Sequence, residues 1–107
     1  MEKFNSQICT TREQSERLLA LGLKKETADC GIYYSELAGC DRMFAKIETE
    51  FEADEIPAWS LHRLIEIVAQ TKYPYRVISK ELPIYDALCE RIKWLIKEGY
   101  FNKEYLV

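Results

Sequence analysis

The sequence lacks the short motifs that identify many enzymes and metal proteins. Its four cysteines are too far apart to form a Cys-x-x-Cys pair, and it contains a single histidine, His62. The four glycines are isolated, so no glycine-rich phosphate loop is present, and no Gly-x-Ser-x-Gly motif occurs. One histidine and dispersed cysteines make a poor set of transition-metal ligands. We therefore expect neither a cofactor nor a bound metal ion.

Long apolar runs and an excess of basic residues are missing as well. The longest charge-free runs, such as residues 56–62 and 67–71, are far shorter than the ~20 apolar residues needed to span a bilayer. The first residues show neither an apolar signal core nor a small-residue cleavage site. The net charge of −3 gives no general attraction to nucleic acid or to anionic membranes. We expect a cytoplasmic protein without a membrane partner.

The cysteines are expected to be reduced and structural, since the chain is long enough to bury a core without covalent links and shows no export signal. Disulfides and a single reactive thiol are the alternatives. The four residues are Cys9, Cys30, Cys40 and Cys89.

The residues that are present predict one globular domain. Of the 107 residues, 48% are apolar and 31% are charged, which is typical of globular proteins. No linker or repeat divides the chain, so we expect a single domain over residues 1–107. The fold class is α+β, with three or four helices packed on a small two- or three-stranded sheet. The expected helices cover residues 13–21, 41–51, 61–70 and 83–98, the strands 4–9, 28–34 and 75–79, and a turn 56–59.

Local signals support several of these elements. Thr11 and Gln14 fit a capping box, and Gly22 fits the left-handed residue that ends a helix. Ser60 fits the N-cap of the helix that follows it. Gly31, inside a strand, indicates a bulge or a close backbone contact. The expected buried faces are Leu61, Leu64, Ile65 and Val68 in one helix and Ile84, Leu88, Ile92 and Leu95 in the last.

The negative charge is concentrated in one segment. Residues 36–55 hold seven acids against two bases, a net charge of −5, whereas the rest of the chain holds 13 bases and 11 acids, a net charge of +2. We interpret this acidic segment as a solvated helix face or an exposed loop. An acidic surface that contacts a basic partner and a site for a hard cation are the alternatives.

His62 and Glu66 are weak candidates for a polar site. In the helix 61–70 they lie one turn apart, so their side chains can form a hydrogen bond. We interpret His62 as a boundary histidine bonded to a neighbour, with a catalytic base or a metal ligand as alternatives. No coherent set of catalytic groups accompanies it, so we assign no catalytic residue.

The last helix carries basic and aromatic residues that are candidates for binding. Arg91, Lys93 and Lys97 can contact phosphates, and neighbouring aromatic rings can stack on bases. The acids among them dilute this signal, and a core helix with an ordinary charged face is the simpler interpretation. We interpret Trp59, beside a proline, and Trp94, off the main apolar stripe, as partly buried under loops, with the role of anchors for a protein partner as the alternative.

Three stretches of the chain resemble a known group of proteins. These are QICTTREQSERLLALGL (7–23) with TAD (27–29), PAWSLHRLIE (57–66), and YDAL (85–88) with WLIKEG (94–99). Together they are similar to small proteins of unknown function from Bacteroides-type gut bacteria, associated with phage or mobile-element regions. The resemblance implies a bacterial or phage-related origin, and it carries over no catalytic residue because that group has no established activity.

These observations favour a small non-enzymatic module that binds a protein partner, either a second copy or a host or phage protein. The absence of a catalytic set and the acidic and aromatic surface candidates support this expectation. A nucleic-acid-binding protein that uses the last helix is one alternative. A small enzyme centred on His62 is the other.

Overall fold

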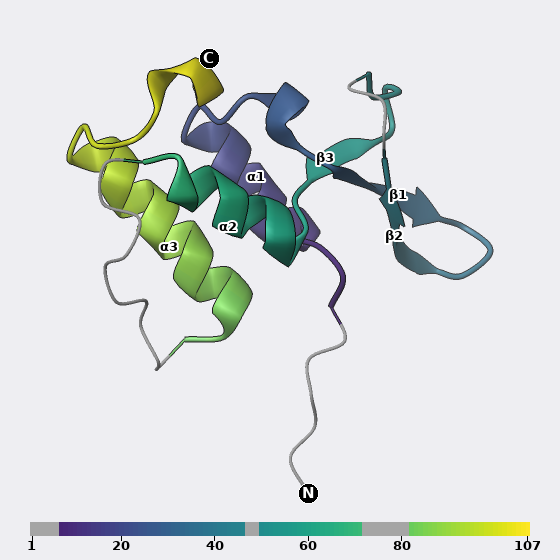
Figure 1. Ribbon diagram of the computed structural model, residues 1–107. Helices are drawn as coiled ribbons and strands as arrows, with labels where there is room; N and C mark the ends of the chain where they lie inside the picture. The colour runs from purple at the N-terminus through teal and green to yellow at the C-terminus, as the bar shows by residue number, and fades with distance from the viewer. Residues whose placement is uncertain (1–6, 47–49, 72–81) are drawn as a thin grey trace, which may run out of the picture.

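The computed structural model describes residues 7–46, 50–71 and 82–107. In these ranges the chain forms three α-helices, three strands and two short 3₁₀ helices. In chain order they are α1 (Arg12–Ala20), η1 (Lys25–Thr27), β1 (Cys30–Ser35), β2 (Cys40–Ala45), β3 (Ile56–Ala58), α2 (Leu61–Ala69), α3 (Ile84–Lys97) and η2 (Lys103–Tyr105). The three helices gather on one side, and the β1–β2 hairpin extends away from them (Figure 1). The predicted α+β class is confirmed.

The starts of α1 and α2 are fixed by side-chain caps, as the sequence predicts. The Thr11 hydroxyl accepts a hydrogen bond from the Gln14 backbone N–H at 3.2 Å, and the Gln14 side chain accepts one from the Thr11 N–H at 3.0 Å. The Ser60 hydroxyl accepts a hydrogen bond from the Arg63 N–H at 3.1 Å. Gly22 has a φ of +97°, which confirms the left-handed residue after α1.

The buried face of α2 differs by one residue from the expected one. Leu64, Ile67 and Val68 are buried, whereas Ile65 is 50% exposed. The prediction that Ile65 faces the core is wrong, because the side of α2 that packs on α3 includes Ile67 instead. In α3 the prediction holds for Leu88, Ile92 and Leu95, but Ile84, in the first turn, is 42% exposed.

The sheet is antiparallel, with β1 between β2 and β3. Ile32 lies opposite both Met43 and Ile56. Gly31 lies opposite Phe44, and a Cβ atom added to Gly31 would come within 2.4 Å of the Phe44 ring. The predicted close contact at Gly31 is therefore confirmed, since the aromatic ring of β2 covers the space that a side chain would occupy.

Two expectations for the middle of the chain are wrong. The helix over residues 41–51 is absent, because residues 40–45 form β2 and pair with β1. The turn over residues 56–59 is also incorrect, since residues 56–58 form β3 on the other side of β1. The expected strand 75–79 lies outside the described residues. The part of the expected strand 4–9 that is described, residues 7–9, is not a strand.

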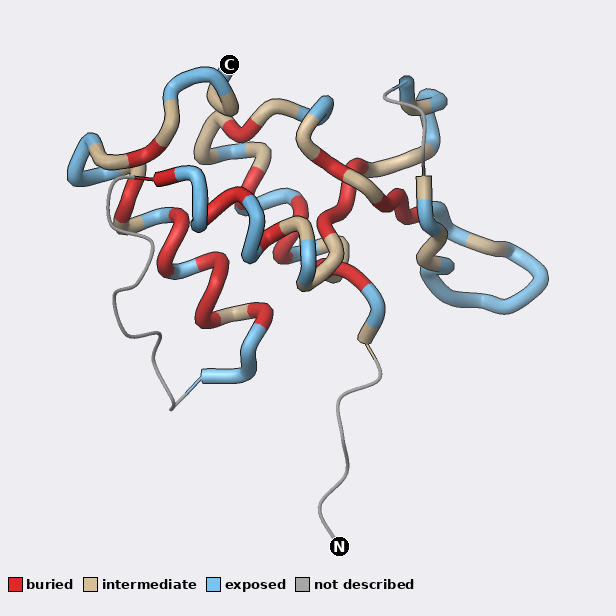
Figure 2. The backbone as a smooth tube through the Cα atoms, viewed as in Figure 1, coloured by how far each residue is buried: buried red, intermediate tan, exposed pale blue. Residues whose placement is uncertain are grey.

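The buried residues form two clusters. The larger lies among the helices and includes Trp59 and Phe101 together with the buried faces of α2 and α3. The smaller lies at the base of the sheet and consists of Cys9, Cys30, Ile32 and Ala58. Figure 2 shows that burial ends where the hairpin leaves the helices, so the tip of the hairpin is a surface feature.

Candidate functional site

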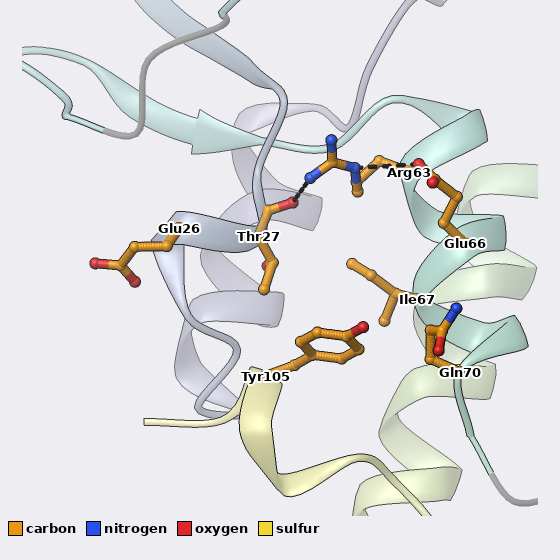
Figure 3. A pocket seen from close by; sticks show the side chains of 7 residues that line it. All are labelled: Glu26, Thr27, Arg63, Glu66, Ile67, Gln70 and Tyr105. Atoms are coloured by element: carbon orange, nitrogen blue, oxygen red, sulfur yellow. Dashed lines mark hydrogen bonds and ion pairs between the residues drawn. The ribbon is translucent and has the colours of Figure 1, made fainter.

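The first candidate site is a hollow beside α2 with a volume of about 350 Å³. It lies between α2, η1 and η2, so three segments that are far apart in the sequence meet there (Figure 3). Its lining residues are Glu26, Thr27, Arg63, Glu66, Ile67, Gln70 and Tyr105. We call this feature the α2 hollow.

Arg63 is held in a fixed position at one end of the α2 hollow. Its guanidinium donates a hydrogen bond to the Thr27 carbonyl oxygen at 2.9 Å, and its Nε lies 3.3 Å from a Glu66 carboxylate oxygen. The Thr27 hydroxyl in turn accepts a hydrogen bond from the Trp59 indole at 2.9 Å. Tyr105 lies at the opposite end (Figure 3). The hollow therefore presents a charged and a phenolic group to a polar ligand.

His62 and Glu66 form the pair that the sequence predicts. His62 Nε2 lies 3.3 Å from a Glu66 carboxylate oxygen, and the His62 side chain is 83% exposed. Glu66 lines the α2 hollow, but His62 does not. The described lining residues include no serine or cysteine that could act as a nucleophile beside the pair. The pair is a solvated contact at the rim, and it can bind a ligand more readily than it can move a proton in a dry site.

The tryptophans differ from each other in position. Trp59 has no exposed surface, so the interpretation of Trp59 as an anchor for a partner is wrong. The apolar ring is buried among the helices, and the hydrogen bond to Thr27 satisfies its one polar atom. Trp94 is half-buried and packs against Tyr100, with ring centroids 5.7 Å apart. Trp94 remains a candidate anchor for a partner, because part of its side chain is exposed.

The basic residues of α3 do not form one surface. Arg91 is only 7% exposed, and its guanidinium lies 5.0 Å from the centre of the Trp94 ring. Lys93 and Lys97 are exposed, one turn apart. Because Arg91 packs its charge against an aromatic ring, the predicted three-residue phosphate contact is reduced to two lysines.

The second candidate site, which the sequence did not predict, is the β1–β2 hairpin. Leu37 is fully exposed at its turn, Tyr34 is 58% exposed and Tyr33 is 39% exposed. A shallow hollow of about 480 Å³ lies on the hairpin beside this turn. It is lined by Tyr33, Ser35, Leu37, Ala38, Arg42, Met43 and Phe44. We call this the hairpin surface, and adjacent exposed apolar groups of this kind mark interaction sites.

The outer edge of β2 adds a second feature to the hairpin. Within the described residues, β2 pairs with β1 on one side and with no strand on the other. The six residues of β2 include neither proline nor lysine, which commonly protect an open edge. Asp41 and Arg42 are the charged residues of β2, and within the described residues no strand pairs with its outer edge.

Acidic side chains lie on the hairpin and on the segment between β2 and β3. Asp41 pairs with Arg12 at 2.8 Å, and this contact lowers the pKa of Asp41. Glu55 accepts a hydrogen bond from the Glu52 backbone N–H and pairs with Lys46 at 3.1 Å, and both contacts lower its pKa. Further exposed carboxylates in the same segment are Glu36, Glu50, Glu52 and Asp54. The described residues of the acidic segment 36–55 therefore form a turn, a strand and a loop rather than the expected helix.

No protein-family model, no curated protein and no solved structure matches this chain.

Two further observations concern metals and membranes. In the described ranges, no group of three or more histidine, cysteine, aspartate or glutamate side chains is arranged to hold a metal ion. Over the same ranges, none of the helices combines the length and the apolar character that crossing a bilayer requires.

Proposed function

We propose that this protein is an interaction module whose β1–β2 hairpin binds an extended, basic segment of a partner protein. The observation that carries the proposal is the combination of an open strand edge with exposed apolar side chains on a projecting hairpin. The α2 hollow has no part in this proposal, because Arg63 and Glu66, two of its three charged lining residues, already pair with each other.

The backbone edge of β2 provides the affinity in this mode of binding. An added strand exchanges main-chain hydrogen bonds with the open edge, and its side chains alternate between the two faces of the sheet. On the hairpin surface these side chains would lie beside Arg42 and Phe44 of β2, and the Phe44 ring lies 5.8 Å from the Tyr33 ring of β1. Leu37 extends the apolar contact beyond the end of the strand. The site therefore suits a segment that carries apolar residues at alternate positions.

The local charge selects a basic partner. Residues 36–55 carry a net charge of −5 even with the exposed Arg42 of the hairpin surface counted, and the exposed carboxylates at residues 36, 50, 52 and 54 account for most of it. Complementary charges raise the rate of encounter and disfavour acidic competitors. Lysine or arginine residues flanking the apolar positions of the partner segment would be attracted by this negative charge.

The alternatives have weaker support. Nucleic-acid binding through α3 would rely on Lys93 and Lys97, because Arg91 is packed in the protein interior. An enzyme centred on His62 would use an imidazole that is 83% exposed and has Glu66 as its ion-pair partner. Neither arrangement brings several accessible groups together, whereas the hairpin combines an unpaired strand edge with exposed apolar side chains.

The test is a selection of binding peptides from a surface-displayed library of random short peptides. We expect the recovered peptides to combine lysine or arginine with apolar residues at alternate positions. Their binding should weaken as salt rises, and it should slow amide hydrogen exchange at residues 40–45. Leu37→Ser should reduce affinity by about tenfold or more, since burying a leucine side chain contributes about 1.5–3 kcal/mol.

Ile65→Ser is the matched control, because Ile65 is also exposed but lies on α2. This variant should bind the selected peptides as the wild-type protein does. The proposal is refuted if the recovered peptides lack basic residues, if their binding protects amides outside β2, or if Leu37→Ser binds them with unchanged affinity.

A further inference from the structure

Two cysteines meet in the buried cluster at the base of the sheet. Cys9 has no exposed surface and Cys30 is 5% exposed. Cys30 lies in β1 opposite Ala58 of β3, and the two residues share a face of the sheet. The Thr10 N–H donates to the Trp59 carbonyl at 2.9 Å, which places the preceding residue, Cys9, alongside β3. The small side chain of Ala58 leaves room for the two thiols.

The side chains of Cys9 and Cys30 lie close enough for a hydrogen bond between the two thiols to be the largest influence on both of their pKa values. This hydrogen bond is the main cause that lowers the pKa of Cys30, and Arg63 acts in the same direction while Asp29 and burial oppose it. The same hydrogen bond, together with burial, raises the pKa of Cys9. The directions of the two pKa shifts favour Cys30 as the attacking thiolate and Cys9 as the second thiol of the pair.

The other two cysteines have no such arrangement. Cys89 is buried in α3, and burial raises its pKa to about 11, so it stays a neutral thiol. Cys40 is exposed at the start of β2. All four cysteines are free in the structure. Only Cys9 and Cys30 belong to the same buried cluster.

We propose that Cys9 and Cys30 form a dithiol that a small peroxide oxidises to a disulfide, a covalent modification site at the base of the sheet. The Cys30 thiolate attacks one oxygen of hydrogen peroxide, the O–O bond breaks, and Cys30 becomes a sulfenic acid as hydroxide leaves. The Cys9 sulfur then attacks the Cys30 sulfur. The S–S bond forms, and the sulfenic hydroxyl leaves with the Cys9 proton as water.

The electrons and atoms balance in this sequence. The two thiols together lose two electrons and two protons, and the peroxide gains them and becomes two molecules of water. Of the two residues only Cys30 retains any exposed surface, 5%, and hydrogen peroxide is among the smallest oxidants that could reach it. The disulfide would join the segment before α1 to β1 and close a loop around α1, which restricts the unfolded chain.

This site is independent of the proposed binding at the hairpin. Cys30 occupies the first position of β1, at the buried end of the strand, and the hairpin turn begins after Ser35 at the other end. Oxidation and peptide binding therefore have separate readouts, and failure of one leaves the other unaffected.

The experiment uses the Cys40→Ser protein, because trypsin would otherwise leave Cys30 and Cys40 in one peptide, residues 26–42. The folded protein is treated with hydrogen peroxide, unfolded in the presence of a thiol-alkylating reagent and digested without reductant. We expect a cross-linked pair of peptides, residues 4–12 and 26–42, with the mass loss of two hydrogens. A reductant should separate the pair, and Cys89 in residues 81–91 should be alkylated.

A second variant isolates the chemical step. In the protein that carries both Cys9→Ser and Cys40→Ser, the sulfenic acid at Cys30 has no neighbouring thiol to condense with. Treatment with dimedone should therefore give a larger yield of the Cys30 adduct than in the Cys40→Ser protein. Circular dichroism before treatment establishes that each variant is folded. The proposal is overturned if residues 4–12 and 26–42 stay unlinked in the folded Cys40→Ser protein, or if Cys89 is consumed at the same rate as Cys9 and Cys30.

Discussion

Replacing Thr10 by valine is expected to destabilise the protein by about 2 kcal/mol. The Thr10 hydroxyl is fully buried, accepts a hydrogen bond from the Trp59 backbone N–H at 3.0 Å and lies 2.8 Å from the Ser15 hydroxyl. Valine fills nearly the same volume but leaves the Trp59 N–H without this partner inside the core, which costs about 1–3 kcal/mol. Ser15 loses less, because a helical serine can turn its hydroxyl to the carbonyl four residues earlier.

Urea denaturation of Thr10→Val and Thr10→Ser separates the hydrogen bond from the packing. Serine keeps the hydroxyl and removes one methyl group, which costs about 1 kcal/mol. We expect the order of stability to be wild type, then Thr10→Ser, then Thr10→Val. The melting temperature of Thr10→Val should fall by roughly 10 °C for a chain of this size. Because threonine, serine and valine differ little in surface area, the dependence of the unfolding free energy on urea concentration should be the same for all three proteins.

A Thr10→Val protein as stable as the wild type would refute this reasoning, and so would one more stable than Thr10→Ser. Combining Thr10→Val with Ser15→Ala tests the contact between the two hydroxyls. The double variant should lose less stability than the sum of the single variants by about 0.5–1 kcal/mol, since neither hydroxyl is then left without the other. Strict additivity would show that the two hydroxyls do not interact.

Two further predictions follow from charge and thiol exposure. The Glu52 N–H and Lys46 lower the pKa of Glu55, so the stability they add is present above the unfolded-state pKa and is lost as the pH falls through the lower folded-state pKa. Urea denaturation at pH 6 and pH 3.5 should therefore show a smaller loss of stability for Glu55→Gln than for the wild type, and equal losses would contradict it. In the folded, reduced protein, Cys40 should react rapidly with a disulfide reagent and Cys89 should react only on unfolding, and equal rates would contradict the assigned burial.

The helices could be predicted because their ends depend on neighbouring residues. The capping box of Thr11 and Gln14, the Ser60 cap and Gly22 are interactions within a few positions of the chain, and the structure contains each of them. Which residues of a helix are buried depends on its neighbours. This is why Ile65 was assigned to the buried face of α2 and Ile67 was not, although the helix itself was found.

The sheet could not be predicted to the same extent, because its pairing joins distant residues. Met43 and Phe44 fit the apolar spacing of a helix, yet they face opposite sides of β2. Met43 packs on the small cluster, and Phe44 covers Gly31 on the other face. Gly39, with a φ of +68°, provides the turn that returns the chain along β1. No signal within residues 41–51 alone distinguishes this arrangement from a helix.

At the candidate sites too, contacts between residues close in the sequence could be predicted and contacts between distant residues could not. His62 and Glu66 meet because they are one helical turn apart, a relation that the sequence contains. Cys9 and Cys30 meet only through the packing of the segment before α1 against β3, so their spacing of 21 residues gives no indication of the contact. Arg91 was misjudged because its charge is held against Trp94, which hydropathy alone does not predict.

In the proposed binding, the acidic segment and Leu37 act at different stages, before and after contact with the partner. Residues 36–55 carry a net charge of −5 while the rest of the chain carries +2, so a basic segment is attracted to the hairpin and repelled from the remaining surface. This field acts before contact and is screened over about 8 Å at physiological ionic strength, whereas Leu37 acts only after contact. Asp54→Lys should therefore slow association of the selected peptides, and Leu37→Ser should speed their dissociation. Surface plasmon resonance measures both rates, and a change in the dissociation rate alone for Asp54→Lys would show that the charge does not steer the encounter.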